Sequence, residues 1–343
     1  MKYWTYLLFL CLCACSRHED IPQSPSNNKN SFAKGADVSW LTEMEQSGRV
    51  FYSREDKATD ALTLLKSLGV NAIRLRVWVD PIDGWCNKED VLVKALRAKA
   101  LGLRLMIDFH YSDTWADPGH QKKPEAWRLL SFEELKNAVK DHTQTTLMLL
   151  KNHQIEVEWV QVGNETRGGF LWPDGQVTAD DSSNFAQLIN AGYAAVKTVY
   201  PKAKVIVHLD DGGNVDLYTW FFDALKANGG QWDVIGLSIY PSWSSDSWAT
   251  LNVKCERNMN ALVRRYGCQV MICEVGMPWD ASIEAKAFLT DLMSKAKHVV
   301  DPGCLGLFYW EPQAYDNWKG YTLGAFDRSG KPTEALEPFK QAE

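Results

Sequence analysis

A regular alternation of apolar runs and amphipathic stretches from Phe32 onward is the strongest constraint on the fold. Runs rich in Val, Ile and Leu occur at Phe32–Trp40, Asn71–Val79, Arg104–Tyr111, Trp159–Glu165, Lys204–Asp211, Val234–Pro241, Val270–Gly276 and Gly306–Pro312. Between these runs, apolar residues recur at helical spacing and predict helices at Asp56–Leu68, Lys88–Leu101, Phe132–Asn152, Asp181–Tyr200 and Ile283–Ala296. Eight strand and helix units without a linker predict one α/β domain over residues 32–343, a closed (β/α)8 TIM barrel. The G-x-G-x-x-G loop that would favour an open doubly wound sheet is absent after the first run.

Polar and aromatic residues end these runs. In a (β/α)8 barrel the carboxyl ends of the strands meet at the face where the connecting loops build the site. The residues at these ends are Asp37, Arg76, Trp78, Asp80, His110, Asn164, Glu165, His208, Asp210, Asp211, Tyr240, Glu274, Trp310 and Glu311. The chain also has 15 Trp and 12 Tyr, many of the Trp in loop-like sequence. Such rings either cap a core or stack on a flat ligand such as a sugar.

Two carboxylates stand at the ends of apolar strands, Glu165 on the fourth and Glu274 on the seventh. An unpaired ionised carboxylate there would be very costly, so neighbouring groups must compensate. Arg76 and His110 are the candidates to keep one carboxylate ionised, while apolar walls and the like charge favour protonation of the other. Two carboxyls with separated pKa values are what glycoside hydrolysis needs, and a separation of about 5 to 5.5 Å would imply retention of configuration.

The sequence also resembles a known family. Asn164-Glu165 and Glu274 resemble the catalytic positions of clan A retaining glycosidases. More narrowly, Gly35-Ala36-Asp37-Val38-Ser39, Ile73-Arg74-Leu75-Arg76-Val77-Trp78, Asp108-Phe109-His110-Tyr111-Ser112-Asp113-Thr114-Trp115-Ala116-Asp117-Pro118-Gly119 and Ser238-Ile239-Tyr240-Pro241 are similar to glycoside hydrolase family 53. The resemblance implies an endo-β-1,4-galactanase that cuts the galactan side chains of pectin.

The resemblance also implies roles for individual residues. Glu165 would be the general acid/base and Glu274 the nucleophile, with Asn164 on the sugar 2-hydroxyl. Arg76 and Tyr240 would orient Glu274. The other expected substrate-binding residues are His110 in the same polar shell, Trp310 as the floor of the site, Trp115 and Asp117 in the third loop, and Asp37.

Two further readings stay open. A different clan A endo-glycanase, such as a β-mannanase or β-1,4-glucanase, would use the same two glutamates. A non-catalytic surface lipoprotein that captures glycans would have no reason to retain Glu165, Glu274 and Asn164 together.

The loops bear on metal binding and on the mode of attack. Residues 276–282 after the seventh strand run almost directly into a helix, and they offer too few oxygen ligands for the calcium that bacterial relatives often bind. We therefore expect no metal and no cofactor. The loops 112–131 and 166–181 are long, whereas those after the seventh and eighth strands look shorter. This pattern predicts an open cleft with aromatic platforms mainly on one side, and hence internal cleavage.

The amino terminus predicts export. An apolar run from Tyr6 to Ala14 is too short for a permanent membrane helix and fits a signal peptide over residues 1–15. It closes on Leu12-Cys13-Ala14-Cys15-Ser16, which resembles a bacterial lipobox with Cys15 as the lipidated residue; a secretory signal cut nearby is the alternative. Residues 16–31 read as a flexible polar tether. We expect an exported bacterial lipoprotein at the outer membrane or cell surface, attached to the membrane only through its lipid.

Charge and cysteine content exclude other classes. The net charge is −6 with no basic run, so nucleic acid is not expected as a partner. The resemblance implies β-1,4-galactan as the partner, and we expect a monomer. The mature chain keeps Cys86, Cys255, Cys268, Cys273 and Cys304, with no zinc spacing. An odd number leaves at least one free thiol, and a bridge between Cys268 and Cys304 is an open question.

Overall fold

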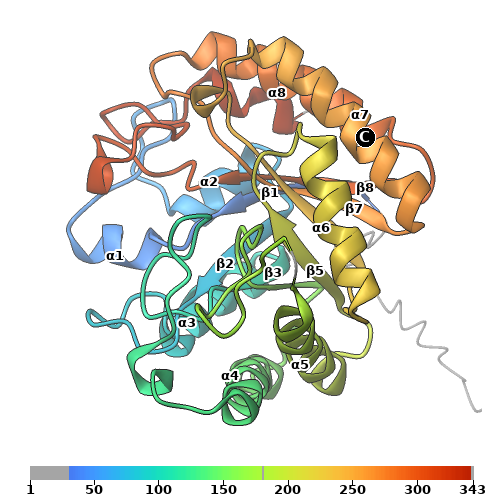
Figure 1. Cartoon of the computed structure of the whole chain (residues 1–343). Coiled ribbons are helices and arrows are strands. Elements are labelled where there is room, and N and C mark those ends of the chain that lie inside the picture. Colours follow the sequence, from blue (N-terminus) through green and yellow to red (C-terminus); the bar gives the residue numbers. More distant parts are fainter. Residues whose placement is uncertain (1–30, 180, 341–343) are drawn as a thin grey trace, which may run out of the picture. The chain divides into compact units, whose positions relative to one another are not determined.

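The computed structural model describes residues 31–179 and 181–340. Eight parallel strands close into a barrel in chain order (Figure 1). They are β1 Ala33–Asp37, β2 Ala72–Val77, β3 Arg104–Phe109, β4 Trp159–Val162, β5 Lys204–Leu209, β6 Val234–Ile239, β7 Gln269–Val275 and β8 Cys304–Trp310. Each overlaps one of the expected apolar runs, so the (β/α)8 barrel expected from the sequence is confirmed.

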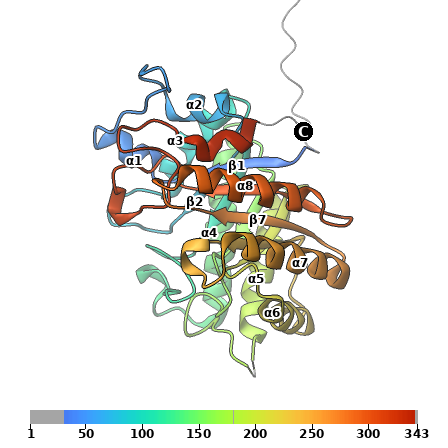
Figure 2. The ribbon, with the colours of Figure 1, turned by 90° about the horizontal axis from the view of Figure 1, so that it is seen from above.

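Helices surround the strands (Figures 1 and 2). They are α1 Leu41–Gln46, α2 Ala61–Ser67, α3 Lys88–Ala100, α4 Phe132–Asn152, α5 Ser183–Val199, α6 Val215–Ala227, α7 Trp248–Tyr266 and α8 Ser282–Lys297, with 3-10 turns η1 Glu125–Trp127, η2 Pro241–Trp243, η3 Trp318–Gly320 and η4 Glu334–Lys340. Local signals set several boundaries. Ser131 and Glu134 form a capping box at the start of α4, and Gly267 adopts the left-handed conformation that ends α7.

The inside of the barrel changes from apolar to polar along each strand. Because alternate side chains of a strand face the same side, one set points inward from every strand. Near the amino-terminal ends this set forms an apolar plug of Ala33, Ala72, Met106, Trp159, Ile206, Val234, Met271, Cys273 and Phe308. Gly35 on β1 leaves the space for Phe308, whose ring would lie 2.1 Å from an added Cβ. The next inward positions toward the carboxyl ends are charged or polar, including Asp37, Arg74, Asp108, Gln161 and His208.

Strand β7 departs from this alternation. Ile272 pairs with Leu237 of β6, but the next paired residue, Ser238, lies opposite Glu274, so Cys273 is an extra residue in the ladder. Such a bulge redirects the side chain that follows it. Cys273 packs in the apolar plug, and Glu274 also reaches the barrel interior, where it contacts Arg74. Regular alternation would point Glu274 outward, so the bulge places it in the site.

The loop after β8 is longer than the sequence suggested. Strand β8 ends at Trp310, and the chain then runs without an α-helix to η4, which starts at Glu334. The expectation of a short loop after β8 was wrong. The sequence after Pro312 has no helical pattern, so the length of this loop was underestimated. The loop after β7 is short, as expected, since α8 begins at Ser282.

Within residues 31–179 and 181–340, no helix is long and apolar enough to cross a bilayer. The expected signal peptide with Cys15, and the tether up to residue 30, lie outside the described residues.

Candidate active site

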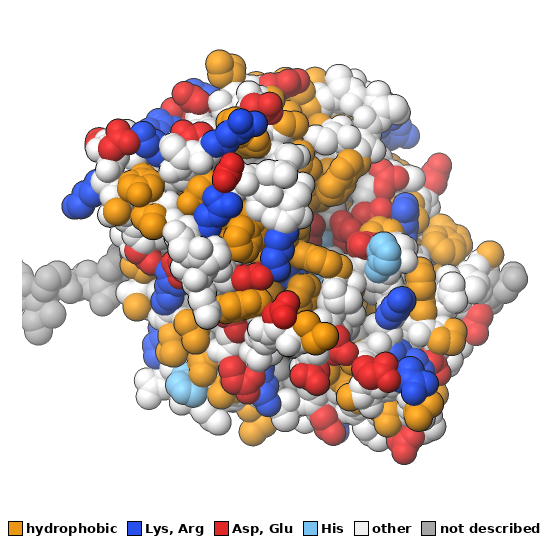
Figure 3. Space-filling view, turned by 90° about the vertical axis from the view of Figure 1, so that its left-hand side faces the viewer, with side chains coloured by type: hydrophobic (Ala, Val, Ile, Leu, Met, Phe, Trp, Pro, Cys, Tyr) orange, Lys and Arg blue, Asp and Glu red, His pale blue; other side chains and the backbone are white. Residues whose placement is uncertain are grey.

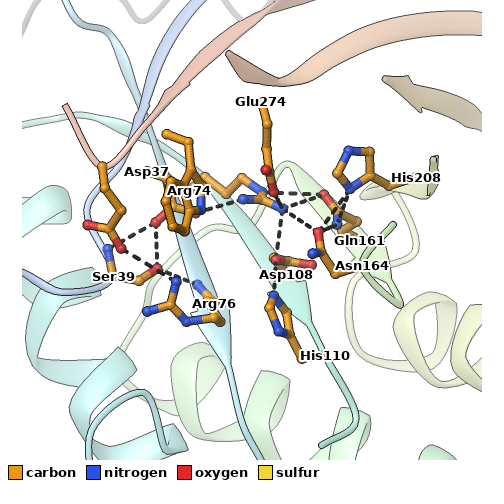
Figure 4. Close-up of polar contacts among 12 residues, drawn as sticks. Asp37, Ser39, Arg74, Arg76, Asp108, His110, Gln161, Asn164, His208 and Glu274 are labelled. Carbon is orange, nitrogen blue, oxygen red and sulfur yellow. Dashed lines mark hydrogen bonds and ion pairs between the residues drawn. The ribbon is translucent and has the colours of Figure 1, made fainter. Parts of the chain in front are cut away.

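Arg74 on β2 is the hub of the polar end of the barrel (Figure 4). Its guanidinium is buried and lies 2.8 Å from Asp37 of β1, 2.8 Å from Asp108 of β3 and 2.8 Å from Glu274 of β7. It also donates to Asn164 Oδ1 at 3.0 Å. A buried arginine among three carboxyl groups favours their ionised forms and orients them through a rigid fork of donors. Strands on several sides of the barrel are thereby tied to one cation.

Glu274 is bonded through both of its oxygens. Oε1 pairs with Arg74, and Oε2 accepts a hydrogen bond of 2.9 Å from the hydroxyl of Tyr240. The side chain is only 7% exposed. Burial raises the pKa of Glu274 to about 7, while the charge of Arg74 and the hydrogen bond from Tyr240 act in the opposite direction. This contact is the one that the expected orienting role of Tyr240 requires, and the role itself stays a prediction.

Glu165 sits in a different environment. It follows β4 after Gly163, and both residues have positive φ angles of 45° and 83°. Its Oε1 accepts a hydrogen bond of 2.7 Å from Ser238, and no arginine or lysine pairs with it in the described part of the chain. Burial and the charge of Glu274 raise the pKa of Glu165 well above its ordinary value. Of the two carboxyls, Glu165 therefore has the environment that favours the protonated form more strongly, and its role as acid/base stays a prediction.

The expectation that Arg76 orients Glu274 was wrong. Arg74 makes that contact, whereas Arg76 pairs with Glu311 at 3.5 Å. Both arginines point inward because they are two residues apart on β2. Arg76 is one step nearer the mouth, where it meets the residues after β8 rather than those of β7. Burial raises the pKa of Glu311 to about 8, with Arg76 opposing the shift.

Arg76 lies among indole rings. Its guanidinium carbon is 4.2 Å from the ring centre of Trp115, 4.8 Å from that of Trp78 and 5.8 Å from that of Trp40. Cation–π contacts of this kind orient aromatic rings as well as stabilise them. Trp310 packs on the same cluster, 5.1 Å from Trp40 and 5.8 Å from Trp115. The rings expected to contact substrate are thus supported by a buried ion pair.

His110 is a support rather than a charged partner of a glutamate. Its Nδ1 accepts hydrogen bonds from Trp78 Nε1 and the Ala116 amide, both at 3.2 Å, so Nε2 carries the proton toward Asp108 at 3.0 Å. Burial lowers the pKa of His110, which favours the neutral ring. The expectation that His110 keeps a catalytic glutamate ionised is corrected, since Arg74 has that position.

The other expected residues divide into two groups. Asp37 has no exposed surface and bonds to Arg74 and Ser39, so the expected contact with substrate is corrected to a supporting role. Asn164 lies beside Arg74, and its amide donates one hydrogen to Ala116 O at 2.8 Å, leaving a second N–H. Trp310 is only partly buried, and Asp117 lies in the wall of the pocket beside Glu165. Their contacts with substrate stay predictions.

A pocket of about 680 Å³ opens beside Glu165. The loops after β3, β4, β5 and β6 form it, and its wall includes Asp117, Arg167, Asp210, Tyr240 and Trp243. Trp243 is 70% exposed and packs 4.3 Å from Tyr240, ring centre to ring centre. Arg167 and Asp210 pair at 3.3 Å. The face drawn in Figure 3 shows acidic side chains gathered in a hollow with hydrophobic side chains around it.

Three residues of this site were not predicted from the sequence. Arg74 and Ser238 both lie in motifs shared with the family, but the arginine nearer the strand end was expected to contact Glu274, and Ser238 was given no role. Gln161 bonds to Arg74 and Asn164, and Ser238 bonds to Glu165 and His208. Their signal was their inward spacing, two or four residues from plug residues on the same strand.

The described residues hold no cluster of metal ligands and no disulfide. No group of three or more His, Cys, Asp or Glu side chains suited to a metal occurs among residues 31–179 and 181–340. Cys268 and Cys304 are free thiols, as are Cys86, Cys255 and Cys273, so the bridge left open by the sequence is not formed.

Comparisons with known proteins agree with this geometry. The family model described as "Glycosyl hydrolase family 53" matches residues 33–339. The chain is 35% identical to an arabinogalactan endo-beta-1,4-galactanase A of Emericella nidulans, with 83% of this chain and 85% of that protein covered. It is 33% identical to an endo-beta-1,4-galactanase of Bacillus subtilis, covering 82% and 70%.

A solved structure points the same way. The family 53 catalytic domain of Ignisphaera aggregans superposes with a TM-score of 0.82 at 32% identity, covering 92% of this chain and 97% of that one. Two carboxylates at the mouth of a closed barrel, the match of the family model over nearly all of the described residues and this agreement in structure lead to one conclusion: the chain belongs to glycosyl hydrolase family 53.

Proposed function

We propose that this chain is a retaining endo-β-1,4-galactanase that hydrolyses internal β-1,4-galactosyl linkages in the (arabino)galactan side chains of pectin. The observation that carries the proposal is the unequal pair of glutamates. Glu274 is bonded to Arg74 and Tyr240, and Glu165 only to Ser238 in the described structure. The activity printed for the relatives of Emericella nidulans and Bacillus subtilis supplies the substrate class.

The two glutamates support a double displacement. Glu274 attacks the anomeric carbon while protonated Glu165 gives its proton to the departing glycosidic oxygen, so a glycosyl–enzyme ester forms as that bond breaks. Glu165, now ionised, takes a proton from water, and the resulting hydroxide attacks the same carbon and releases Glu274. Two inversions restore the original configuration. Arg74 and Tyr240 keep Glu274 aimed in both steps, and the remaining N–H of Asn164 is available to the sugar 2-hydroxyl, a role that stays proposed.

The mode of attack follows from the openness of the site. The pocket beside Glu165 is formed by the loops after β3 to β6, and the indole rings of Trp40, Trp115 and Trp310 lie toward β8 and β1. A site with platforms in both directions suits a chain that extends past the scissile bond at either end. The sequence had predicted platforms mainly on one side of the two glutamates, and we propose rings on both sides instead.

Two measurements test the function. A time course of oligosaccharides from unbranched β-1,4-galactan should show products of several lengths, with no release from mannan or cellulose. Viscosity of the galactan solution should fall rapidly at low conversion, when few reducing ends have formed. Galactose or galactobiose as the first product with viscosity nearly unchanged would contradict internal cleavage, and faster hydrolysis of mannan or cellulose would contradict the substrate.

Export and lipid attachment are a separate proposal. The lipobox-like sequence at Cys15 supports an exported bacterial lipoprotein at the outer membrane or cell surface that acts as a monomer. Labelling of the expressed protein with an alkyne fatty acid should mark the wild type and not Cys15→Ala. Label retained in that variant would refute lipidation at Cys15, and a dimer in light scattering would refute the monomer.

A further inference from the structure

A second hollow of about 500 Å³ lies at the carboxyl ends of β1, β2, β3 and β8. Its wall includes the indoles of Trp40, Trp78, Trp85 and Trp115, with Ile82 and Lys319 beside them. Neither Glu165 nor Glu274 lines it. We refer to it as the four-tryptophan hollow.

The composition of this hollow fits a carbohydrate. Ile82 is 99% exposed, and Trp78 and Trp85 are partly exposed. Exposed apolar side chains that line a concave site are available to a ligand that enters it. The remaining wall is acidic, with Glu43, Asp80, Asp83, Asp113 and Glu125. Aromatic faces cover the apolar face of a sugar ring, and carboxylates accept hydrogen bonds from its hydroxyl groups.

The walls of the hollow are tied together by hydrogen bonds. Asp113 accepts from the amides of Asp80 at 2.9 Å and Glu125 at 2.8 Å, which joins the loops after β2 and β3. The amide of Trp78 donates to Cys86 O at 2.8 Å and closes the turn that carries Ile82 and Trp85. Arg76 lies under the rings of Trp78 and Trp115. A site built in this way needs little ordering when a ligand binds.

The hollow adjoins the end of β8 through packed rings. Trp40 and Trp115 line it and also pack against Trp310, which ends β8. The pocket beside Glu165 lies in the other direction, on the loops after β3 to β6. Because Glu165 protonates the departing oxygen, its pocket receives the leaving part of the chain. The four-tryptophan hollow is then on the side of the sugar that becomes bound to Glu274.

We infer that the four-tryptophan hollow binds galactosyl residues of the same β-1,4-galactan chain, on the non-reducing side of the sugar attacked by Glu274, with Trp85 and Ile82 as its outer platform. This inference rests on the proposed function. On this inference, the loop after β2 makes the enzyme prefer substrates with several galactosyl residues on the non-reducing side of the cleaved bond.

Trp85→Ala tests the inference. Wild type and variant are compared on linear β-1,4-galacto-oligosaccharides of three to six residues, labelled at the reducing end so that the cleaved bond is identified. In the wild type kcat/KM should rise with length as the hollow fills. The variant should lose about tenfold on the hexasaccharide and less than about twofold on the trisaccharide, the size expected when one apolar contact is removed. Its cleavage should move toward the non-reducing end.

Matched variants keep the result interpretable. Trp220→Ala removes an indole that is 41% exposed on α6 and lines neither hollow, so it should behave as wild type. Trp243→Ala, in the pocket beside Glu165, should move cleavage toward the reducing end. Ile82→Ala removes a fully exposed side chain that contributes nothing to packing and should give a smaller loss of the same length dependence as Trp85→Ala.

The outcomes separate this inference from the proposed function. Equal loss at every length, no loss in either Trp85→Ala or Ile82→Ala, or a loss confined to arabinose-branched polymer would overturn the inference. If wild type does not cleave linear galactan at all, the proposed function has failed instead.

Discussion

The hydrogen bond from Tyr240 to Glu274 allows a prediction whose sign and size both come from the structure. Tyr240→Phe removes one hydroxyl and keeps the ring that packs on Trp243. A hydrogen bond to a charged acceptor is worth about 1.5–3 kcal/mol. Its loss should therefore lower kcat/KM on galactan by about 10- to 100-fold at the optimum pH.

The same change should move the pH profile. Glu274 must be ionised to attack, so activity rises with pH through its pKa, which lies at about 7. The Tyr240 hydroxyl favours the ionised form and lowers that pKa. Without it the pKa rises further, and the acidic limb of the kcat/KM profile should shift to higher pH by about one unit and by at most about two.

The assay is reducing-sugar release from galactan between about pH 4 and pH 9. Measurements spaced by about 0.5 pH units resolve the expected shift of the acidic limb. Tyr218→Phe is the control, because its buried hydroxyl donates to Leu209 O at 2.8 Å and does not touch Glu274. It should leave the acidic limb in place. An acidic limb that stays put or moves to lower pH in Tyr240→Phe, with Tm near wild type, would refute the orienting role.

Further predictions concern the carboxylates, the ion pair and metal. Glu274→Gln should lower turnover on galactan by several orders of magnitude. Glu165→Ala should do the same on galactan but recover activity on aryl galactosides with good leaving groups. The assigned roles would be contradicted if either variant kept more than about a tenth of the wild-type rate on galactan, which is a rise in the barrier of less than about 1.4 kcal/mol. Arg76→Ala removes the cation beside Glu311, which keeps hydrogen bonds from the Trp40 amide and Gln313, and should cost about 1–3 kcal/mol in urea unfolding above pH 8, where Glu311 is ionised; Glu311→Gln should restore part of it in the double variant. A loss under about 1 kcal/mol would show that the pair is unimportant. EDTA should leave Tm and activity unchanged, whereas a drop of several degrees reversed by calcium would reveal a metal site.

Much of this architecture could be predicted from the sequence because periodicity and strand ends carry it. Glu165 and Glu274 were found as carboxylates closing apolar strands, and Tyr240 by its motif. The choice between Arg74 and Arg76 could not be made that way. Both face inward, and which of them is level with Glu274 depends on how the strands are staggered around the closed barrel. The long loop after β8 was also underestimated, because a segment without helical periodicity gives no sign of where it ends.

The bulge in β7 has a consequence for anyone who transplants this site. In a regular strand every second side chain points into the barrel. A glutamate transplanted onto such a strand would therefore be placed at one of these alternate positions. Here Cys273 and Glu274 are consecutive, and the side chains of both point into the barrel. A designer who copies the glutamate and its partners onto an idealised barrel would therefore point the nucleophile at the surrounding helices. The extra residue therefore belongs to the geometry of the active site, although its own side chain packs in the apolar plug.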